Sequence, residues 1–287
     1  MKRITARTIT IAAFVLLFIP ALGIVAYAQA PASQAKMMSI WQARRAITTK
    51  PNDKVVAYGG YRSIRFSADG FEYDVLTPKK PPVTVKVDLT AAPMVMTHCK
   101  KYGCWIDDQS GRPFPKNTGL KSYLDSQRWL DVGSGQSSCL FCDSTPYTCS
   151  AECVHAAESF AAAFNVLQAF AKDTNAPLRT FPPRAVTWRT LATKPPIPEE
   201  VRIQRLMAED AVKANKPGEA LNYYENGIEL YPTWPEGNFN AALIAGELGY
   251  YADAIEHMQA YLELVPDAAD AQAARDKILI WQVKSKQ

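Results

Sequence analysis

The C-terminal part of the chain repeats itself at a spacing of 34 residues, and this period restricts its fold more than any other feature of the sequence. The lines GEALNYYENGIELYP and ADAIEHMQAYLELVP align along their whole length. The alignment matches Ala220 with Ala254, Leu230 with Leu264, and Pro232 with Pro266. A period of this length is typical of solenoids built from pairs of helices. We therefore predict an all-α array in residues 201–287.

Both lines resemble the second helix of a tetratricopeptide repeat, in which a small residue lies where two helices cross and a proline ends the helix. The resemblance covers two repeats, 201–234 and 235–268, and residues 269–283 follow as a capping helix. The small residue that the family has on its first helices is kept as Ala208 and Ala242. Other positions depart from the family: Gln204 and Asn238 stand for its tryptophan, Ala211 and Ala245 for its large aromatic residue, and Gly227 and Tyr261 for its second small residue on helix two.

The resemblance implies a binding groove lined by the first helices of the repeats. Carried over by the 34-residue register, its residues are Arg202, Arg205, Glu209, Glu236, Phe239, Asn240 and Leu243. Asn240 matches the asparagine with which some family members hold a peptide, whereas Leu206 stands where a second asparagine would be. The expected partner is a protein or peptide with acidic and hydrophobic residues. The alternative is that Phe239 and Leu243 only pack on the neighbouring linker.

Residues 29–178 follow a different pattern, in which apolar and polar residues alternate. Residues 63–66 and 71–75 alternate around Ala68-Asp69-Gly70, which predicts a β-hairpin, and residues 83–89 predict a further strand. From Val154 to Lys172 the period becomes helical. Its apolar face carries Phe160, Phe164, Leu167 and Ala171. Strands followed by one amphipathic helix predict an α+β domain ahead of the all-α array.

The segment IRFSADGFEYDV and the helix ESFAAAFNVLQAF resemble, in their order, small bacterial domains of pleckstrin-homology-like shape, in which a bent sheet is capped by a terminal helix. This resemblance covers residues 38–172 and implies no catalytic residues. The alternative is an unrelated α+β domain that is stapled by disulfides.

Residues 179–200 separate these two parts and contain five prolines, including Pro182-Pro183 and Pro195-Pro196. Proline removes a backbone donor and disfavours the interior of helices and sheets, so we predict an extended linker here. Trp188 and Leu191 predict that this linker packs on a surface.

The N-terminus carries Lys2, Arg3 and Arg7 ahead of an apolar run that extends from residue 9 to residue 26. This is the pattern of an export signal, and the small residues around Ala26-Tyr27-Ala28 predict cleavage after Ala28. The alternative is an uncleaved membrane anchor. We expect a periplasmic or extracellular protein that does not span the membrane once residues 1–28 are removed.

An exported chain with an even number of cysteines is expected to form disulfides. The six cysteines, which would make three bridges, are Cys99, Cys104, Cys139, Cys142, Cys149 and Cys153. The last four also have the spacing of two close pairs of zinc ligands, which leaves a zinc site or a redox centre as the alternative. The six residues between those pairs are fewer than zinc ribbons use, and the first two cysteines would be left over.

The charge of the chain is divided unevenly between its two parts. Residues 29–200 hold 21 Lys and Arg against 15 Asp and Glu (+6), whereas residues 201–287 hold 8 against 13 (−5). Opposite charges favour docking between the two parts, although modest imbalances also occur on solvated faces. No basic run with interleaved aromatic residues is present, so the sequence does not suggest nucleic-acid binding.

No catalytic, metal or cofactor motif stands out in the sequence. His98, His155 and His257 lie on separate predicted elements, and we expect each to be a surface histidine or one with its hydrogen bonds made. The leading hypothesis is a non-enzymatic interaction or scaffold module of the cell envelope, with self-association as a further expectation. The alternatives are a redox or zinc protein that uses the cysteines, and an enzyme whose residues are scattered along the chain.

Overall fold

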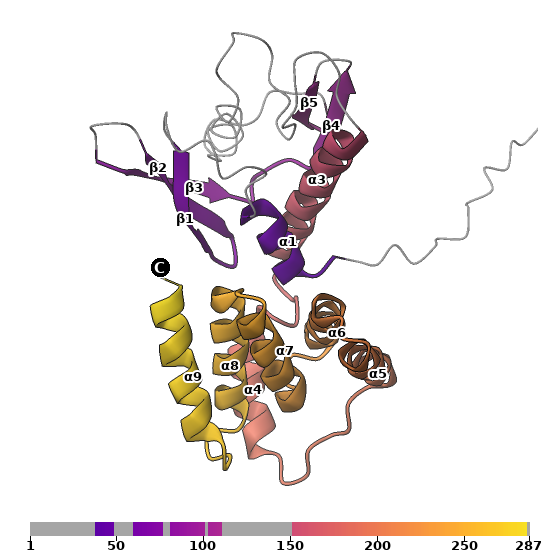
Figure 1. The fold of residues 1–287 in the computed structure, drawn as a ribbon, viewed down its shortest axis with the longest axis vertical. Coiled ribbons are helices and arrows are strands. Elements are labelled where there is room, and N and C mark those ends of the chain that lie inside the picture. The colour runs from indigo at the N-terminus through magenta and orange to yellow at the C-terminus, as the bar shows by residue number, and fades with distance from the viewer. Residues whose placement is uncertain (1–37, 49–59, 77–80, 101–102, 111–150, 286–287) are drawn as a thin grey trace, which may run out of the picture. The chain divides into compact units, whose positions relative to one another are not determined.

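The computed structural model describes residues 38–48, 60–76, 81–100, 103–110 and 151–285 (Figure 1). The predicted signal peptide lies outside the described residues. So do three of the cysteines that are predicted to form disulfides or bind zinc, namely Cys139, Cys142 and Cys149. The side chains of the other three cysteines are likewise not described.

The first described element is a helix that the sequence pattern did not predict, α1 (Ile40–Thr48). It begins with a capping box, because the Ser39 hydroxyl accepts from the backbone N–H of Gln42 at 3.1 Å. The Gln42 side chain accepts in turn from the backbone N–H of Ser39 at 2.8 Å. This exchange satisfies two of the donors that a helix start leaves without partners. The apolar side chains of α1 are buried, and they come from Ile40, Trp41, Ala43 and Ile47.

Two small antiparallel sheets follow. The first joins β1 (Gly60–Phe66), β2 (Gly70–Leu76) and β3 (Val83–Asp88) in sequence order, and the second pairs β4 (Val95–Lys100) with β5 (Gly103–Asp108). The predicted hairpin and third strand are therefore confirmed. Gly70 is required where β2 meets β3, since a Cβ there would lie 2.0 Å from the carbonyl oxygen of Val87. In the second sheet Cys99 and Cys104 are direct cross-strand partners.

The long helix α3 (Ala151–Lys172) packs its predicted apolar face into the core of this part of the molecule. Phe164 is fully buried and meets the ring of Phe71 edge to face, with 6.3 Å between the ring centroids. Asn165 binds both backbone groups of Val95 at the start of β4, at 2.9 and 2.8 Å. Its side-chain amide thus takes the place of a neighbouring strand.

The predicted extended linker is wrong in its first half, where α4 (Phe181–Thr190) forms. Pro182 and Pro183 occupy the first turn of this helix, and a first turn needs no backbone N–H from its residues, so proline is well tolerated there. The expectation that this segment packs on a surface is confirmed for Trp188, which is buried against Leu264. Leu191 is exposed.

The C-terminal part is an array of antiparallel helices, as predicted. It contains α5 (Glu199–Lys213), α6 (Pro217–Leu230), α7 (Pro235–Glu247), α8 (Tyr251–Leu264) and α9 (Ala271–Lys284). The small residues at the predicted helix crossings are all fully buried: Ala208, Ala220, Ala242 and Ala254. Trp234, in the connection between α6 and α7, fills a slot that exists because Gly227 and Gly237 have no side chains. A Cβ on Gly237 would lie 2.1 Å from the Trp234 ring.

The fold class is therefore a mostly helical chain with small antiparallel sheets in its N-terminal part and a repeat-like helical array in its C-terminal part. The disulfide staple stays a prediction, and so does the pleckstrin-homology-like shape.

Candidate binding surfaces of the helical array

The array has two faces that differ in what contacts them. The first-helix face carries the predicted groove residues of α5 and α7. The second-helix face is formed by α6 and α8 and is contacted by α1 and α4.

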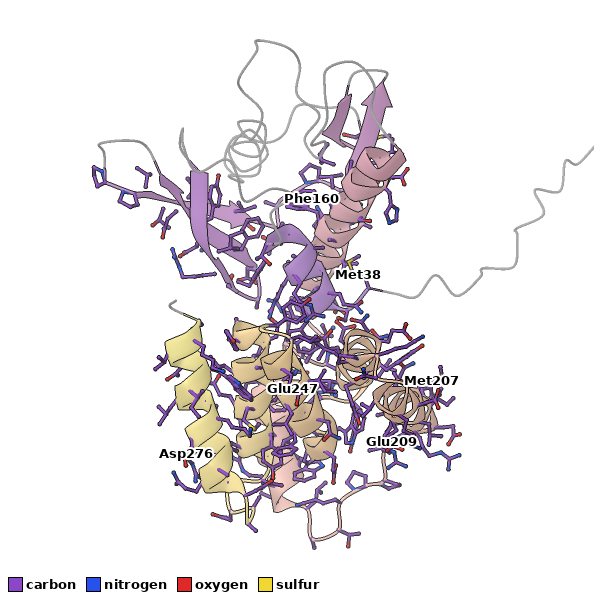
Figure 2. The ribbon with its side chains drawn as sticks, in the orientation of Figure 1. Met38, Phe160, Met207, Glu209, Glu247 and Asp276 are labelled. Atoms are coloured by element: carbon purple, nitrogen blue, oxygen red, sulfur yellow. The ribbon has the colours of Figure 1, made fainter. Side chains whose placement is uncertain are left out.

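On the first-helix face, α5 presents two arginines that are each paired with a carboxylate of the same helix. Arg202 lies 3.0 Å from Glu199, and Arg205 lies 3.6 Å from Glu209. All four side chains are between 42% and 62% exposed, so these side chains are accessible to solvent. Leu206, which follows Arg205 in α5, is 51% exposed. Met207 and Glu209 of α5 are labelled in Figure 2.

The α7 half of this face is held more firmly. The side-chain amide of Asn240 donates to the Tyr224 hydroxyl at 3.2 Å, and burial raises the pKa of that hydroxyl. The ring of Phe239 packs on Tyr261 with 4.9 Å between centroids. Burial also raises the pKa of Tyr261 to about 12, and its hydroxyl donates to Asp270.

The seven predicted groove residues thus lie on the first helices α5 and α7, and on α7 Phe239, Asn240 and Leu243 are half-buried while Glu236 is exposed. The alternative that Phe239 and Leu243 pack on the linker stays a prediction. The linker helix α4 packs on α8, and Arg189 donates to the backbone carbonyl of Glu263.

The second-helix face holds a buried ionic cluster whose cation comes from α1. The Arg45 guanidinium makes two hydrogen bonds to Glu225 of α6, at 2.6 and 2.8 Å, and a third to Asp253 of α8 at 2.6 Å. The Glu225 side chain is completely buried, and the side chains of Arg45 and Asp253 are 15% and 11% exposed. Ser39 adds a hydrogen bond to Glu225 at 3.0 Å. We call Ser39, Arg45, Glu225 and Asp253 the anchor cluster.

Burial and pairing act against each other in the anchor cluster. Burial opposes the charge of Glu225, but hydrogen bonds and charge from Arg45 outweigh it, so the pKa of Glu225 is lowered. Burial dominates at Asp253, whose pKa is raised although Arg45 opposes the shift. The pKa of Arg45 is raised by its two carboxylates in spite of burial.

Further contacts surround the anchor cluster. The ring of Trp41 lies 4.5 Å from the ring of His257, and both side chains are almost completely buried. The Nε2 atom of His257 lies 3.8 Å from Glu225, and neither ring nitrogen has a hydrogen-bond partner among the described residues. The expectation of a surface or hydrogen-bonded histidine at position 257 is therefore wrong. His155 is exposed, as expected.

Two carboxylates extend the contact between α1 and the array. Burial raises the pKa of Glu229 to about 7, and Glu229 accepts a hydrogen bond from the backbone N–H of Ile40. Arg44 pairs with Glu256 at 2.7 Å. The expected attraction between a basic N-terminal part and an acidic array is thus present at α1.

None of the anchor residues was a predicted site residue. The sequence did hold one signal for α1, the Ser39-x-x-Gln42 capping box, which marks a helix start without saying where that helix docks.

Comparison with known proteins found no matching family model for this chain and no matching relative among curated proteins. Across the described ranges, no helix is both long enough and apolar enough to cross a membrane. Those same ranges contain no group of three His, Cys, Asp or Glu side chains that could hold a metal ion.

Proposed function

We propose that this chain is an exported, non-enzymatic interaction module, in which a tetratricopeptide-type array holds a protein or peptide partner on its first-helix face. The observation that carries the proposal is the contrast between the two faces. The second-helix face is contacted by α1 and α4, whereas the predicted groove residues of α5 and α7 are exposed or half-buried.

The chemistry of this face favours a peptide that carries both acidic and apolar residues. Arg202 and Arg205 are each paired with an exposed carboxylate of their own helix, and such pairs contribute little, so a partner carboxylate can replace them at low cost. Leu206, on the same helix, offers exposed apolar surface. Asn240 and Phe239 form a more rigid neighbouring surface, because each is fixed by a tyrosine of a second helix.

Two exposed leucines of the array allow a matched test. Leu206 lies on the first-helix face, and Leu230 lies at the end of α6 with a similar exposure of 55%. A photo-crosslinking residue placed at position 206 in the cell envelope should capture one reproducible partner, and the same residue at position 230 should not.

Charge substitutions then measure the contribution of the groove to binding. We expect Leu206→Glu to weaken binding of the captured partner by roughly tenfold or more, as for a residue at the centre of an interface, and Leu230→Glu to leave it within about twofold. Both variants should melt like the parent chain. Equal effects of the two substitutions on binding would overturn the assignment of this face.

Export and the role of the cysteines have separate tests. Sequencing of the mature N-terminus should begin at Gln29. Thiol titration of protein from an oxidising compartment should find no free thiol, and elemental analysis should find no stoichiometric zinc. Two or more free thiols, or bound zinc whose removal unfolds the protein, would instead favour the redox or zinc alternative.

A further inference from the structure

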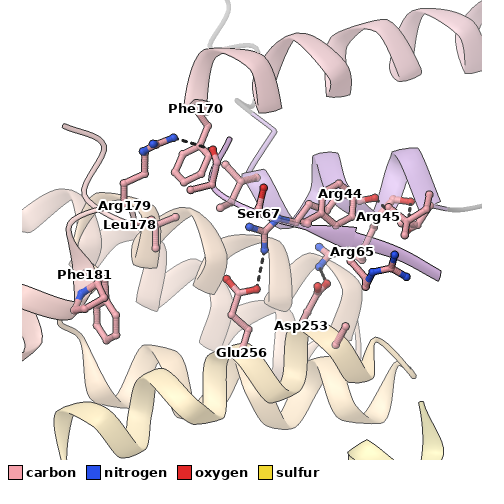
Figure 3. Close-up of a pocket in the computed structure, with 17 residues that line it drawn as sticks. Arg44, Arg45, Arg65, Ser67, Phe170, Leu178, Arg179, Phe181, Asp253 and Glu256 are labelled. Atoms are coloured by element: carbon pink, nitrogen blue, oxygen red, sulfur yellow. Dashed lines mark hydrogen bonds and ion pairs between the residues drawn. The ribbon is translucent and has the colours of Figure 1, made fainter. Parts of the chain in front are cut away.

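A cavity of about 700 Å³ opens beside α1, away from the first-helix face (Figure 3). Its wall combines α1, the end of β1, the last turn of α3, the start of α4 and the first turn of α8. Because α3 and α4 follow each other directly, these five elements come from four separate stretches of the chain. This volume lies in the range of pockets that hold small molecules, which often form where parts of a protein meet.

The charged wall of this cavity is mainly cationic, since four arginines and two carboxylates line it. Two of the arginines, Arg44 and Arg179, are largely buried, with side chains 14% and 17% exposed. Their carboxylate partners are not: Glu256 is 49% exposed and Asp69 is 61% exposed. Each pair thus joins a fixed cation to a carboxylate that can turn into water, and such a pair is readily exchanged.

The two guanidinium groups are held by contacts other than these carboxylates. Arg179 donates to the backbone carbonyls of Ala68 and Ala171 at 2.8 and 3.0 Å, and its guanidinium carbon lies 5.9 Å from the centre of the Phe170 ring. The guanidinium carbon of Arg44 lies 5.4 Å from the centre of the Phe66 ring. Both cations would stay in position if their carboxylates left.

Most of the uncharged residues in the wall are apolar. Phe66, Phe170, Phe181 and Leu178 line the same cavity as the two arginines. In Figure 3, Phe170, Leu178 and Phe181 lie on the side of Arg179, and the dashed line from Arg44 leads to Glu256. A ligand that fills this space meets aromatic surface along its body and a guanidinium at its end.

We propose that this cavity binds a small amphipathic organic acid, with a carboxylate on Arg44 or Arg179 and an aromatic or branched apolar body against the phenylalanines. Guanidinium groups accept carboxylates in a bidentate geometry, and stacking of the guanidinium on a ring leaves its edge free for this. A cationic ligand is disfavoured, because Asp253 in the same wall is already bound to Arg45. This inference does not depend on the partner proposed for the first-helix face.

The test uses the full chain and three probes of one shape. These are 3-phenylpropionate, the neutral 3-phenylpropan-1-ol and the cationic 3-phenylpropylamine, with dissociation constants measured by ligand-observed NMR. The acid should bind saturably and at least about tenfold more tightly than the alcohol, as expected for a charge-assisted contact. The amine should not bind.

Substitutions of the two kinds of partner should act in opposite directions. Arg44→Met and Arg179→Met should each weaken binding of the acid about fivefold or more while leaving the alcohol within about twofold. Glu256→Gln and Asp69→Asn, which remove competing carboxylates, should each tighten it. Arg275→Met, at an exposed arginine of α9 outside the cavity, is the matched control and should leave the affinity for the acid unchanged.

Three outcomes would overturn the proposal. They are acid binding weaker than about 10 mM, equal affinity for the acid and the alcohol, and no gain in affinity from either carboxylate substitution. The carboxylate substitutions keep both arginines, so they test the proposal even if an arginine variant fails to fold.

Discussion

The two faces of the array use the same kinds of residue for different purposes. Arg45 and Glu225 on the second-helix face are 15% and 0% exposed, whereas Arg205 and Glu209 on the first-helix face are 42% and 47% exposed. The buried pair fastens α1 to α6, and Arg45 also binds Asp253 of α8. The exposed pair lies within the single helix α5, and a carboxylate of a binding partner can replace Glu209 in it.

This difference shows that charge content alone does not reveal the role of a face. An exposed ion pair is worth about 0 to 1 kcal/mol, because water screens both charges. In a buried pair, loss of one partner costs about 3 to 5 kcal/mol, because the other charge stays in a place that water does not reach. The following predictions test this difference, beginning with the largest effect.

Separating the array from its cover should have the largest effect. A fragment of residues 199–287 lacks α1 and α4, so the buried surfaces of α6 and α8 become exposed, and two repeats alone bury less shared core than the three usually needed. We expect a broad thermal transition by circular dichroism, far below that of the full chain. A sharp, concentration-independent melt at the temperature of the full chain would contradict this prediction.

Matched substitutions in the two ion pairs should differ by several kcal/mol. Arg45→Met leaves Glu225 and Asp253 buried without their cation and should lower the free energy of unfolding by about 3 to 5 kcal/mol. Arg205→Met should lower it by less than about 1 kcal/mol. Urea denaturation measures both, and equal losses would remove the distinction between the faces.

The stability of the covered face should also depend on pH through Glu229. Its pKa is about 7 in the folded protein, against an ordinary value of 4.5, because of burial first and the neighbouring charge of Glu225 second. The folded chain therefore binds this proton more tightly than the unfolded chain does. Its contribution is fully present below pH 4.5 and is lost as the pH rises through 7, by roughly 3 kcal/mol.

This dependence is isolated by comparison with Glu229→Gln. Between pH 5 and pH 8 the parent chain should lose stability relative to that variant in urea denaturation. Glu219→Gln, at a carboxylate that is 50% exposed, is the control and should run parallel to the parent. If the difference in unfolding free energy between the parent and Glu229→Gln does not change with pH, the pKa of Glu229 is not raised in the folded protein.

The smallest predicted effects concern two glycines of the array. A Cβ on Gly246 would lie 2.6 Å from the Trp281 ring, so Gly246→Ala should destabilise the seam between α7 and α9 by about 1 to 3 kcal/mol. Gly218, at the start of α6, has open space around it. Gly218→Ala should therefore stabilise the chain by about 0.5 kcal/mol. Thermal melts should therefore show a lower melting temperature for Gly246→Ala and a higher one for Gly218→Ala. Equal shifts of the two variants would contradict the tight packing of Gly246 against Trp281.

Local patterns predicted most of the elements but few of their contacts. The two-residue period of β1 to β3 and the 34-residue spacing of the array each follow from which side chains must be buried together, so they are visible in sequence. The helix α4 was missed because its prolines were judged by their number, although their place in the first turn permits a helix.

The anchor cluster could not be predicted from the sequence for a different reason. Glu225 and Asp253 lie on helices rich in acidic residues, and nothing near them in the chain distinguishes a buried carboxylate from a solvated one. Their partner Arg45 is far away in the sequence. The groove residues could be named because the repeat register fixes them, but their tyrosine partners Tyr224 and Tyr261 come from the other helices and were not foreseen.

The distance along the chain between α1 and its partners has a consequence for the order of folding. Arg45 is separated from Glu225 by 180 residues and from Asp253 by 208. Synthesis proceeds from the N-terminus, so α1 is made long before either acceptor exists, and contacts of such long range form slowly. In a chain that stops before α8, Arg45 can bind Glu225 but lacks its hydrogen bond to Asp253. Docking of α1 is therefore a late event, because it requires that both α6 and α8 have been synthesised and folded.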